Sequence, residues 1–163
     1  MKKLIYTLLI IIALTNNSFS AGSSSDNDST PKMSDYTKAK NLVKAAKKYE
    51  KKGKVEKAQK RYAKAQKLLL KSNKKKPLQA DTLNYLGFTT RKLGDYEKGE
   101  EYYLQGLQIQ PSHKGINEYL GELYVVTNRM DMAKERLEVL KNCGCEEYDQ
   151  LKEIIAGTKK SKY

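Results

Sequence analysis

A unit of about 34 residues occurs twice in succession in this sequence, and this repetition restricts the folds that the chain can adopt. The pair Leu86-Gly87 in residues 80–113 returns as Leu120-Gly121 in residues 114–145. A unit of this length cannot bury its apolar face alone, so neighbouring units must stack and share one core. The sequence therefore predicts a repeat array.

Each unit has the pattern of two joined helices. Leu83, Leu86 and Thr90 recur at spacings of three and four residues, which places them on one face of a helix. Gly94 follows a basic helix end and can adopt the left-handed conformation that stops a helix. Pro111 then ends the second helix. The fold class predicted for these units is all-α, built from helical hairpins.

A more divergent unit precedes these two, and a single helix follows them. Residues 39–72 contain a small–aromatic–small series at the same spacing as in the second unit: Ala58, Tyr62 and Ala65. Residues 146–156 have the apolar periodicity of one further helix. Repeat arrays need such an end helix to cover the last apolar face, so we expect three hairpins and a capping helix.

These repeats resemble the tetratricopeptide (TPR) family over about residues 39–156. The resemblance rests on NYLGF at 84–88, EYLGELY at 118–124 and GCEEY at 144–148, which are similar to segments of small exported bacterial TPR proteins. It implies a right-handed array of three TPR hairpins with a C-terminal capping helix. It also implies a non-enzymatic adaptor or scaffold that binds a protein or peptide segment in a concave groove.

The concave groove of a repeat array is lined by the first helix of each repeat. The candidate binding residues at these positions are Lys40, Lys47, Asn84, Phe88, Arg91, Lys92, Glu118 and Glu122. Phe88 is expected to be an exposed anchor, because aromatic residues dominate many interfaces. The residues that resemble the carboxylate clamp of some TPR proteins are Lys40, Lys47, Asn84 and Arg91, whereas Glu118 and Glu122 depart from it. The alternative is a groove whose polar residues only keep it soluble.

The N-terminal residues have the features of a signal peptide. Lys2 and Lys3 precede an apolar run at residues 4–14, and small residues follow this run near the expected cleavage position. The predicted signal peptide comprises residues 1–20. The run is shorter than the roughly 20 residues that span a membrane. We expect a periplasmic or secreted protein without an integral span after cleavage; an uncleaved anchor is the alternative. Residues 21–35 then form a polar linker, 36–157 the repeat domain and 158–163 a basic tail.

The charge of the chain is uneven. Residues 32–76 hold 18 Lys and Arg against 3 Asp and Glu, a net +15, whereas residues 77–163 hold 12 against 14, a net −2. A basic half favours an acidic partner, such as an anionic envelope polymer or lipid surface bound through the first repeat. Export argues against nucleic acid. The alternative is a solvated lysine coat.

Few residues offer reactive chemistry. Cysteines of exported proteins usually pair, so Cys143 and Cys145 could form a local staple, remain free thiols or catalyse thiol–disulfide exchange. His113 is the only histidine and lies beside Ser112, which is expected to cap the next helix. Without a second histidine, neither a metal site nor a Ser/His relay is expected. The sequence predicts no catalytic residues and no cofactor.

Overall fold

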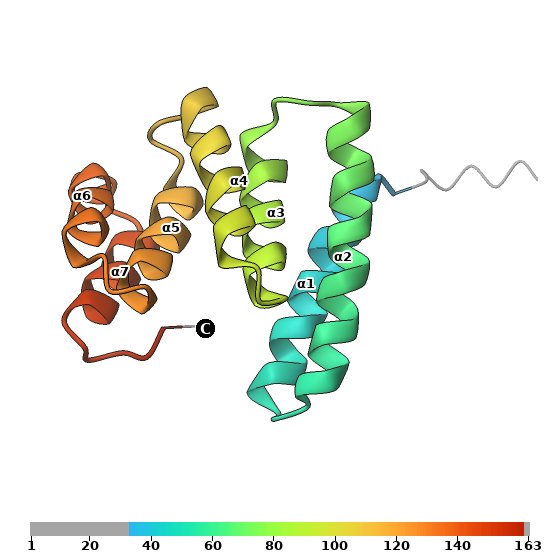
Figure 1. The fold of residues 1–163 in the computed structure, drawn as a ribbon, viewed down its shortest axis with the longest axis horizontal. Helices are drawn as coiled ribbons and strands as arrows, with labels where there is room; N and C mark the ends of the chain where they lie inside the picture. The colour runs from blue at the N-terminus through green and yellow to red at the C-terminus, as the bar shows by residue number, and fades with distance from the viewer. Residues whose placement is uncertain (1–32, 162–163) are drawn as a thin grey trace, which may run out of the picture. The chain divides into compact units, whose positions relative to one another are not determined.

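The computed structural model describes residues 33–161, which contain seven α-helices and no strand (Figure 1). The helices are α1 (Asp35–Lys51), α2 (Val55–Lys75), α3 (Ala80–Lys92), α4 (Tyr96–Ile109), α5 (Lys114–Val126), α6 (Met130–Leu140) and α7 (Glu146–Ile155). Successive helices pair as α1 with α2, α3 with α4 and α5 with α6, while α7 packs on α5 and α6. The predicted all-α fold of three hairpins and an end helix is confirmed.

The predicted signal peptide, most of the linker and the last two residues lie outside the described part of the chain. Within residues 33–161, no helix combines the length and apolar character that a membrane-spanning helix requires.

The turns inside the hairpins form where the sequence offers residues that tolerate a left-handed backbone. Gly53, Gly94 and Asn128 have φ values of +67°, +98° and +58° at the three equivalent turns. Glycine pays no steric cost in this region, and asparagine is the residue that most often replaces it there. The placement of these three residues explains why each helix pair folds back on itself.

The Leu-Gly pair of the repeats marks the closest helix contacts. A Cβ atom on Gly87 would lie 2.5 Å from the ring of Tyr103 in α4. A Cβ atom on Gly121 would lie 2.5 Å from Cδ2 of Leu151 in α7. Tyr103 and Leu151 are both fully buried. Each glycine therefore leaves room for a large side chain from a neighbouring helix. In the third hairpin this neighbour is α7, which lies where the next repeat of a longer array would pack.

The second helix is longer than the sequence predicts. It continues to Lys75, past the expected end of the first unit at residue 72. Asp35 at the start of α1 provides the physical reason, because the Lys75 ammonium lies 2.8 Å from its carboxylate. This ion pair joins the end of α2 to the start of α1, and the nearby lysines lower the pKa of Asp35.

Candidate binding cleft

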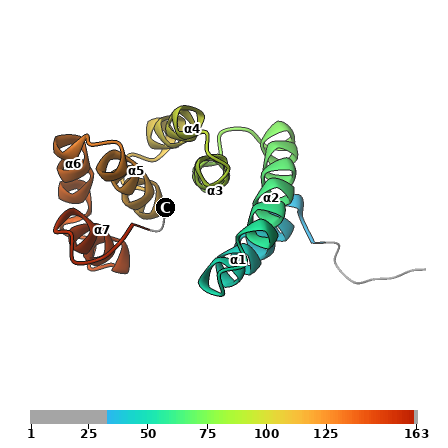
Figure 2. The same ribbon diagram turned by 60° about the horizontal axis from the view of Figure 1, so that its bottom comes forward.

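The first helices of the three hairpins, α1, α3 and α5, face a common side of the array (Figure 2). Their N-terminal halves leave a cleft of about 600 Å³, here called the inner cleft. Its lining is aromatic and polar, and includes Tyr36, Lys40, Asp81, Asn84, Tyr85, Glu118 and Tyr119. The cleft therefore lies where the repeat pattern places the binding face, but it occupies only part of that face.

The predicted groove residues divide into three groups. Those that line the inner cleft are Lys40, Asn84 and Glu118. Those on the C-terminal halves of α1, α3 and α5, here called the deep half, are Lys47, Phe88, Arg91 and Glu122. Lys92 belongs to neither, because its ammonium lies 2.6 Å from Glu50 in a separate depression near the α3–α4 turn.

The prediction that Phe88 is an exposed anchor is wrong. Its side chain is only 1% exposed, and its ring centroid lies 5.8 Å from that of Tyr62 and 5.0 Å from that of Tyr119. Lys47 covers the ring: its Nζ lies 4.4 Å from the ring centroid and donates a hydrogen bond of 3.1 Å to the Tyr119 hydroxyl. The first and third hairpins thus meet over Phe88, which becomes a core residue.

Arg91 and Glu122 form an ion pair inside the deep half. Arg91 Nη2 lies 3.4 Å from Glu122 Oε2, and neither side chain is exposed. Arg91 Nη1 also donates to the backbone carbonyl of Tyr119. These two predicted groove residues therefore hold α3 against α5, and the solvent-facing role expected for them is wrong.

Asn84 offers an unused hydrogen-bond acceptor at the inner cleft. The residue is 7% exposed, and within residues 33–161 its Oδ1 atom has no hydrogen-bond partner. A buried polar atom without a partner costs about 1–3 kcal/mol. Buried polar atoms in folded proteins are nearly always paired, so an unpaired acceptor on a residue that lines a cleft marks a place where a ligand donor would be favourable.

Three tyrosines line the inner cleft that the sequence analysis did not select. The rings of Tyr36 and Tyr85 meet edge to face with centroids 5.9 Å apart. Burial raises the pKa of Tyr36, Tyr85 and Tyr119, so their phenols remain protonated hydrogen-bond donors at neutral pH. The sequence held a signal for two of these tyrosines, because Tyr85 and Tyr119 occupy the same position of successive repeats.

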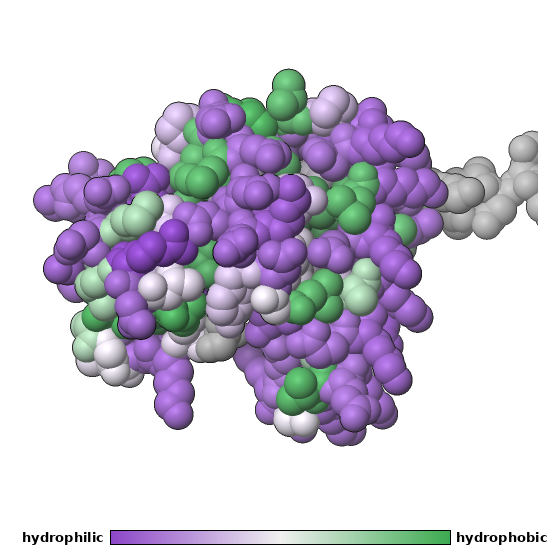
Figure 3. Space-filling view, viewed as in Figure 1, coloured by the Kyte–Doolittle hydropathy of each residue, from purple (hydrophilic) through white to green (hydrophobic). Residues whose placement is uncertain are grey.

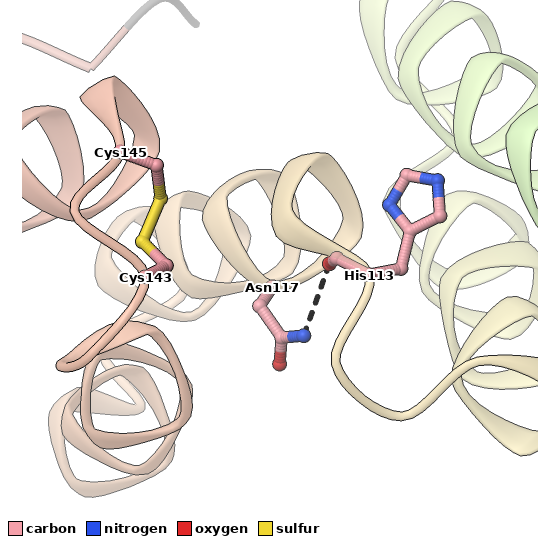
Figure 4. Close-up of a disulfide and its surroundings, with 4 residues drawn as sticks. All are labelled: His113, Asn117, Cys143 and Cys145. Atoms are coloured by element: carbon pink, nitrogen blue, oxygen red, sulfur yellow. Dashed lines mark hydrogen bonds between the residues drawn. A yellow bond between two sulfur atoms is a disulfide. The ribbon is translucent and has the colours of Figure 1, made fainter.

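His113 fixes one rim of the inner cleft. It caps α5, since its Nδ1 accepts a hydrogen bond of 3.1 Å from the Ile116 N–H, so the cap is His113 and not the predicted Ser112. The ring proton then lies on Nε2, 3.3 Å from Asp81 Oδ1 on α3. Asn117 completes the turn by donating to the carbonyl oxygen of Pro111 and, as Figure 4 shows, to that of His113. His113 therefore has a structural role.

Cys143 and Cys145 are joined by a disulfide in the connection between α6 and α7 (Figure 4). Their Cα atoms are 5.2 Å apart, and Gly144 between them has a φ of +55°. The bond agrees with the local-staple alternative. Within residues 33–161, no group of three or more potential metal-ligating side chains gathers.

A basic surface, separate from the inner cleft, lies on the first hairpin. Lys57, Lys60, Arg61 and Lys64 line a shallow depression of about 360 Å³ beside the ring of Tyr49. The surface over α1 and α2 is largely hydrophilic (Figure 3). The basic half of the sequence therefore corresponds to an exposed face of one hairpin, which we call the lysine face.

The sequence matches no protein-family profile and no curated protein. Among solved structures, the chain is similar to the first TPR domain of Spaghetti (RPAP3) bound to an HSP90 peptide, with 18% identity and a TM-score of 0.49 over 78% of this chain and 98% of that one. It is similar to the first TPR domain of human RPAP3, with 19% identity and a TM-score of 0.47 over 77% and 98%. It is also similar to a chain of the CopN–Scc3 complex, with 18% identity and a TM-score of 0.49 over 82% and 80%.

Proposed function

We propose that this chain is a non-enzymatic adaptor that is exported to the periplasm or secreted, and that it binds a protein or peptide segment in the inner cleft. The features of residues 1–20 support the export step. The cleft supports the binding step, because it lies on the first helices of the repeats, where such arrays present their binding surface.

Asn84 carries this proposal. The residue lines the cleft, and its buried amide oxygen has no hydrogen-bond partner in residues 33–161; an extended peptide carries backbone N–H groups that would satisfy it. The tyrosine rings beside it provide apolar surface, and their hydroxyl groups provide hydrogen-bond donors. Aromatic side chains of this kind contribute much of the binding energy at interfaces.

Replacing Asn84 with alanine should weaken partner binding without destabilising the fold. The substitution removes an unpaired buried acceptor, so the free energy of unfolding should stay unchanged or rise by about 1 kcal/mol. Partner binding would lose a hydrogen bond to a desolvated group, a loss of at least about tenfold in affinity. Quantitative mass spectrometry of proteins captured from envelope extracts by the immobilised chain measures the binding, and urea unfolding measures the stability.

Gln66 provides the matched control. It lies on α2, outside the inner cleft, and its amide donates a hydrogen bond of 2.8 Å to the Thr90 hydroxyl. Gln66→Ala should therefore lower the stability and leave the captured proteins unchanged, which is the reverse of the pattern for Asn84→Ala. Equal capture by wild type and Asn84→Ala would contradict binding at the inner cleft.

A second candidate function is binding of an anionic envelope polymer or lipid surface by the lysine face. The clustering of Lys57, Lys60 and Lys64 on exposed parts of α2, beside the half-buried Arg61, favours it. Binding of this kind weakens strongly with added salt. If binding is unchanged by Asn84→Ala but is lost after lysine-to-glutamine changes on α2, this second function is favoured over the first.

A further inference from the structure

The connection between α2 and α3 presents an exposed leucine at its tip. Leu78 is 72% exposed, more than any other large apolar side chain in residues 33–161. Figure 1 shows this connection along the upper edge of the molecule, and in the same view Figure 3 shows a hydrophobic projection at that edge. Single exposed apolar residues are common on protein surfaces, so the backbone of Leu78 and the charges around it decide what this exposure means.

The backbone of Leu78 has a conformation that leucine disfavours. Its φ is +57°, and Asn128 is the only other residue besides glycine with a positive φ in residues 33–161. The left-handed region brings Cβ close to the backbone, and only glycine and asparagine adopt it readily. Such strain persists where other interactions compensate for it, often at functional sites. Because the Leu78 side chain is largely exposed, its contacts within residues 33–161 do not explain why this position holds a leucine.

Backbone hydrogen bonds on both sides hold the tip in place. The Lys76 N–H donates to the Ser72 carbonyl at 2.9 Å at the end of α2, and the Gln79 carbonyl accepts a hydrogen bond of 3.0 Å from α3. The ring of Pro77, directly before Leu78, fixes its own φ. Few backbone torsions are therefore free between the two helices, so binding through the tip would require little further ordering of the chain.

Lysines surround the tip. Residues 67–79 hold no acidic residue and five lysines, all exposed: Lys67, Lys71, Lys74, Lys75 and Lys76. The first three recur at spacings of four and three, which places them on one face of α2 with Leu70, itself 44% exposed. Two carboxylates lie at this end: Asp35 pairs with Lys75, and Asp81 lines a pocket with Lys75 and Lys76. Five ammonium groups against two carboxylates leave a net charge of +3 around Leu78.

We propose that the α2–α3 connection is a membrane-contact site, in which Leu78 enters the headgroup region of an anionic lipid bilayer and the surrounding lysines contact lipid phosphates. Exposed apolar side chains among cationic ones are the chemistry of segments that bind at membrane interfaces. A dissolved polyanion would use the lysines but would offer no apolar medium to Leu78, so the leucine selects the bilayer. The inference goes beyond peptide binding in the inner cleft, and it differs from charge-only binding at Lys57–Lys64, toward the other end of α2.

A tryptophan at the tip reports insertion directly, because the chain contains none of its own. In the full chain as recovered after export, carrying Leu78→Trp, vesicles rich in phosphatidylglycerol should shift the fluorescence emission to shorter wavelengths, and brominated acyl chains should quench it. Vesicles of phosphatidylcholine alone should do neither, because they lack the negative charge that attracts lysines. Leu104→Trp is the matched control, since Leu104 is 43% exposed on α4, and its emission should not respond. Unchanged emission from Leu78→Trp would overturn the proposal.

Leu78→Asn removes the apolar side chain and keeps the charge, and asparagine tolerates the left-handed backbone. The unfolding midpoint should therefore stay equal or rise, so unfolding would not account for weaker binding. Binding to phosphatidylglycerol-rich vesicles, measured by cosedimentation, should weaken by about tenfold because a leucine side chain no longer leaves water. Leu104→Asn should bind as wild type does. Equal binding by wild type and Leu78→Asn would contradict insertion and assign the adsorption to the lysines alone.

Two further comparisons separate this proposal from charge-only binding and from the proposed function. Dextran sulfate, a soluble polyanion, should bind wild type and Leu78→Asn equally, and a parallel loss of both ligands would contradict selection of the bilayer by Leu78. Asn84→Ala should leave vesicle binding unchanged, whereas Leu78→Asn should leave protein capture at the inner cleft unchanged. Either proposal can therefore fail while the other stands.

Discussion

Replacing Arg91 with methionine should lower the free energy of unfolding by about 3–5 kcal/mol, because the change removes the buried cation that pairs with Glu122. The Arg91 and Glu122 side chains are both inaccessible to solvent, so water cannot replace the lost partner. Arg91 also donates to the carbonyl of Tyr119, and that bond is lost as well. Urea unfolding followed by circular dichroism measures the effect.

The double variant Arg91→Met/Glu122→Met separates a buried charge from simple loss of packing. Replacing both members of a buried ion pair with apolar residues of similar size is often neutral or stabilising, so the double variant should be more stable than Arg91→Met. Lys134→Met removes an exposed ion pair on α6 and should leave the unfolding midpoint unchanged. If the losses of stability in Arg91→Met and Glu122→Met simply add up to the loss in the double variant, the coupling between the two side chains is contradicted.

Leu151→Ala should cost about 2–5 kcal/mol, the range measured for large-to-small substitutions in protein cores. Leu151 is fully buried and fills the notch above Gly121, so alanine would leave a cavity between α7 and α5. Thermal unfolding should show a markedly lower midpoint. Lys152→Ala, at the exposed neighbouring position, is the control and should change the midpoint little.

Gly121→Ala provides the reciprocal test of the same contact. The added methyl would overlap Leu151, so this variant alone should also be destabilised. Combined with Leu151→Ala, the methyl would occupy part of the cavity, and the double variant should be more stable than the sum of the two single losses implies. A melting curve unaffected by Leu151→Ala would show that α7 does not cap the array.

The sequence predicted the hairpins because the residues that form them act locally. Gly94 and Asn128 stop helices through their own backbone conformation, and the Leu-Gly pairs mark close contacts at a fixed repeat distance. The periodicity also identified α3 and α5 as helices that line one face, and Asn84 and Glu118, which it assigned to that face, line the inner cleft. These features depend little on how one hairpin is oriented against another.

The depth of the groove could not be predicted in this way. Whether Phe88 is exposed depends on how closely the first hairpin approaches the third, and a long side chain such as Lys47 can cover an aromatic ring only when that distance is known. Arg91 and Glu122 looked like groove residues for the same reason. The return of Ser161 to Glu122 joins residues far apart in the sequence, and no repeat pattern predicts it.

Hydrogen–deuterium exchange, with and without a captured partner, tests most directly the central claim that the inner cleft is the binding site. The account predicts slower exchange on partner binding in the N-terminal halves of α3 and α5, which carry Asn84 and Glu118, with little change along α2. Slower exchange confined to α2 around Lys57–Lys64, with α3 and α5 unchanged, would contradict it and assign binding to the lysine face.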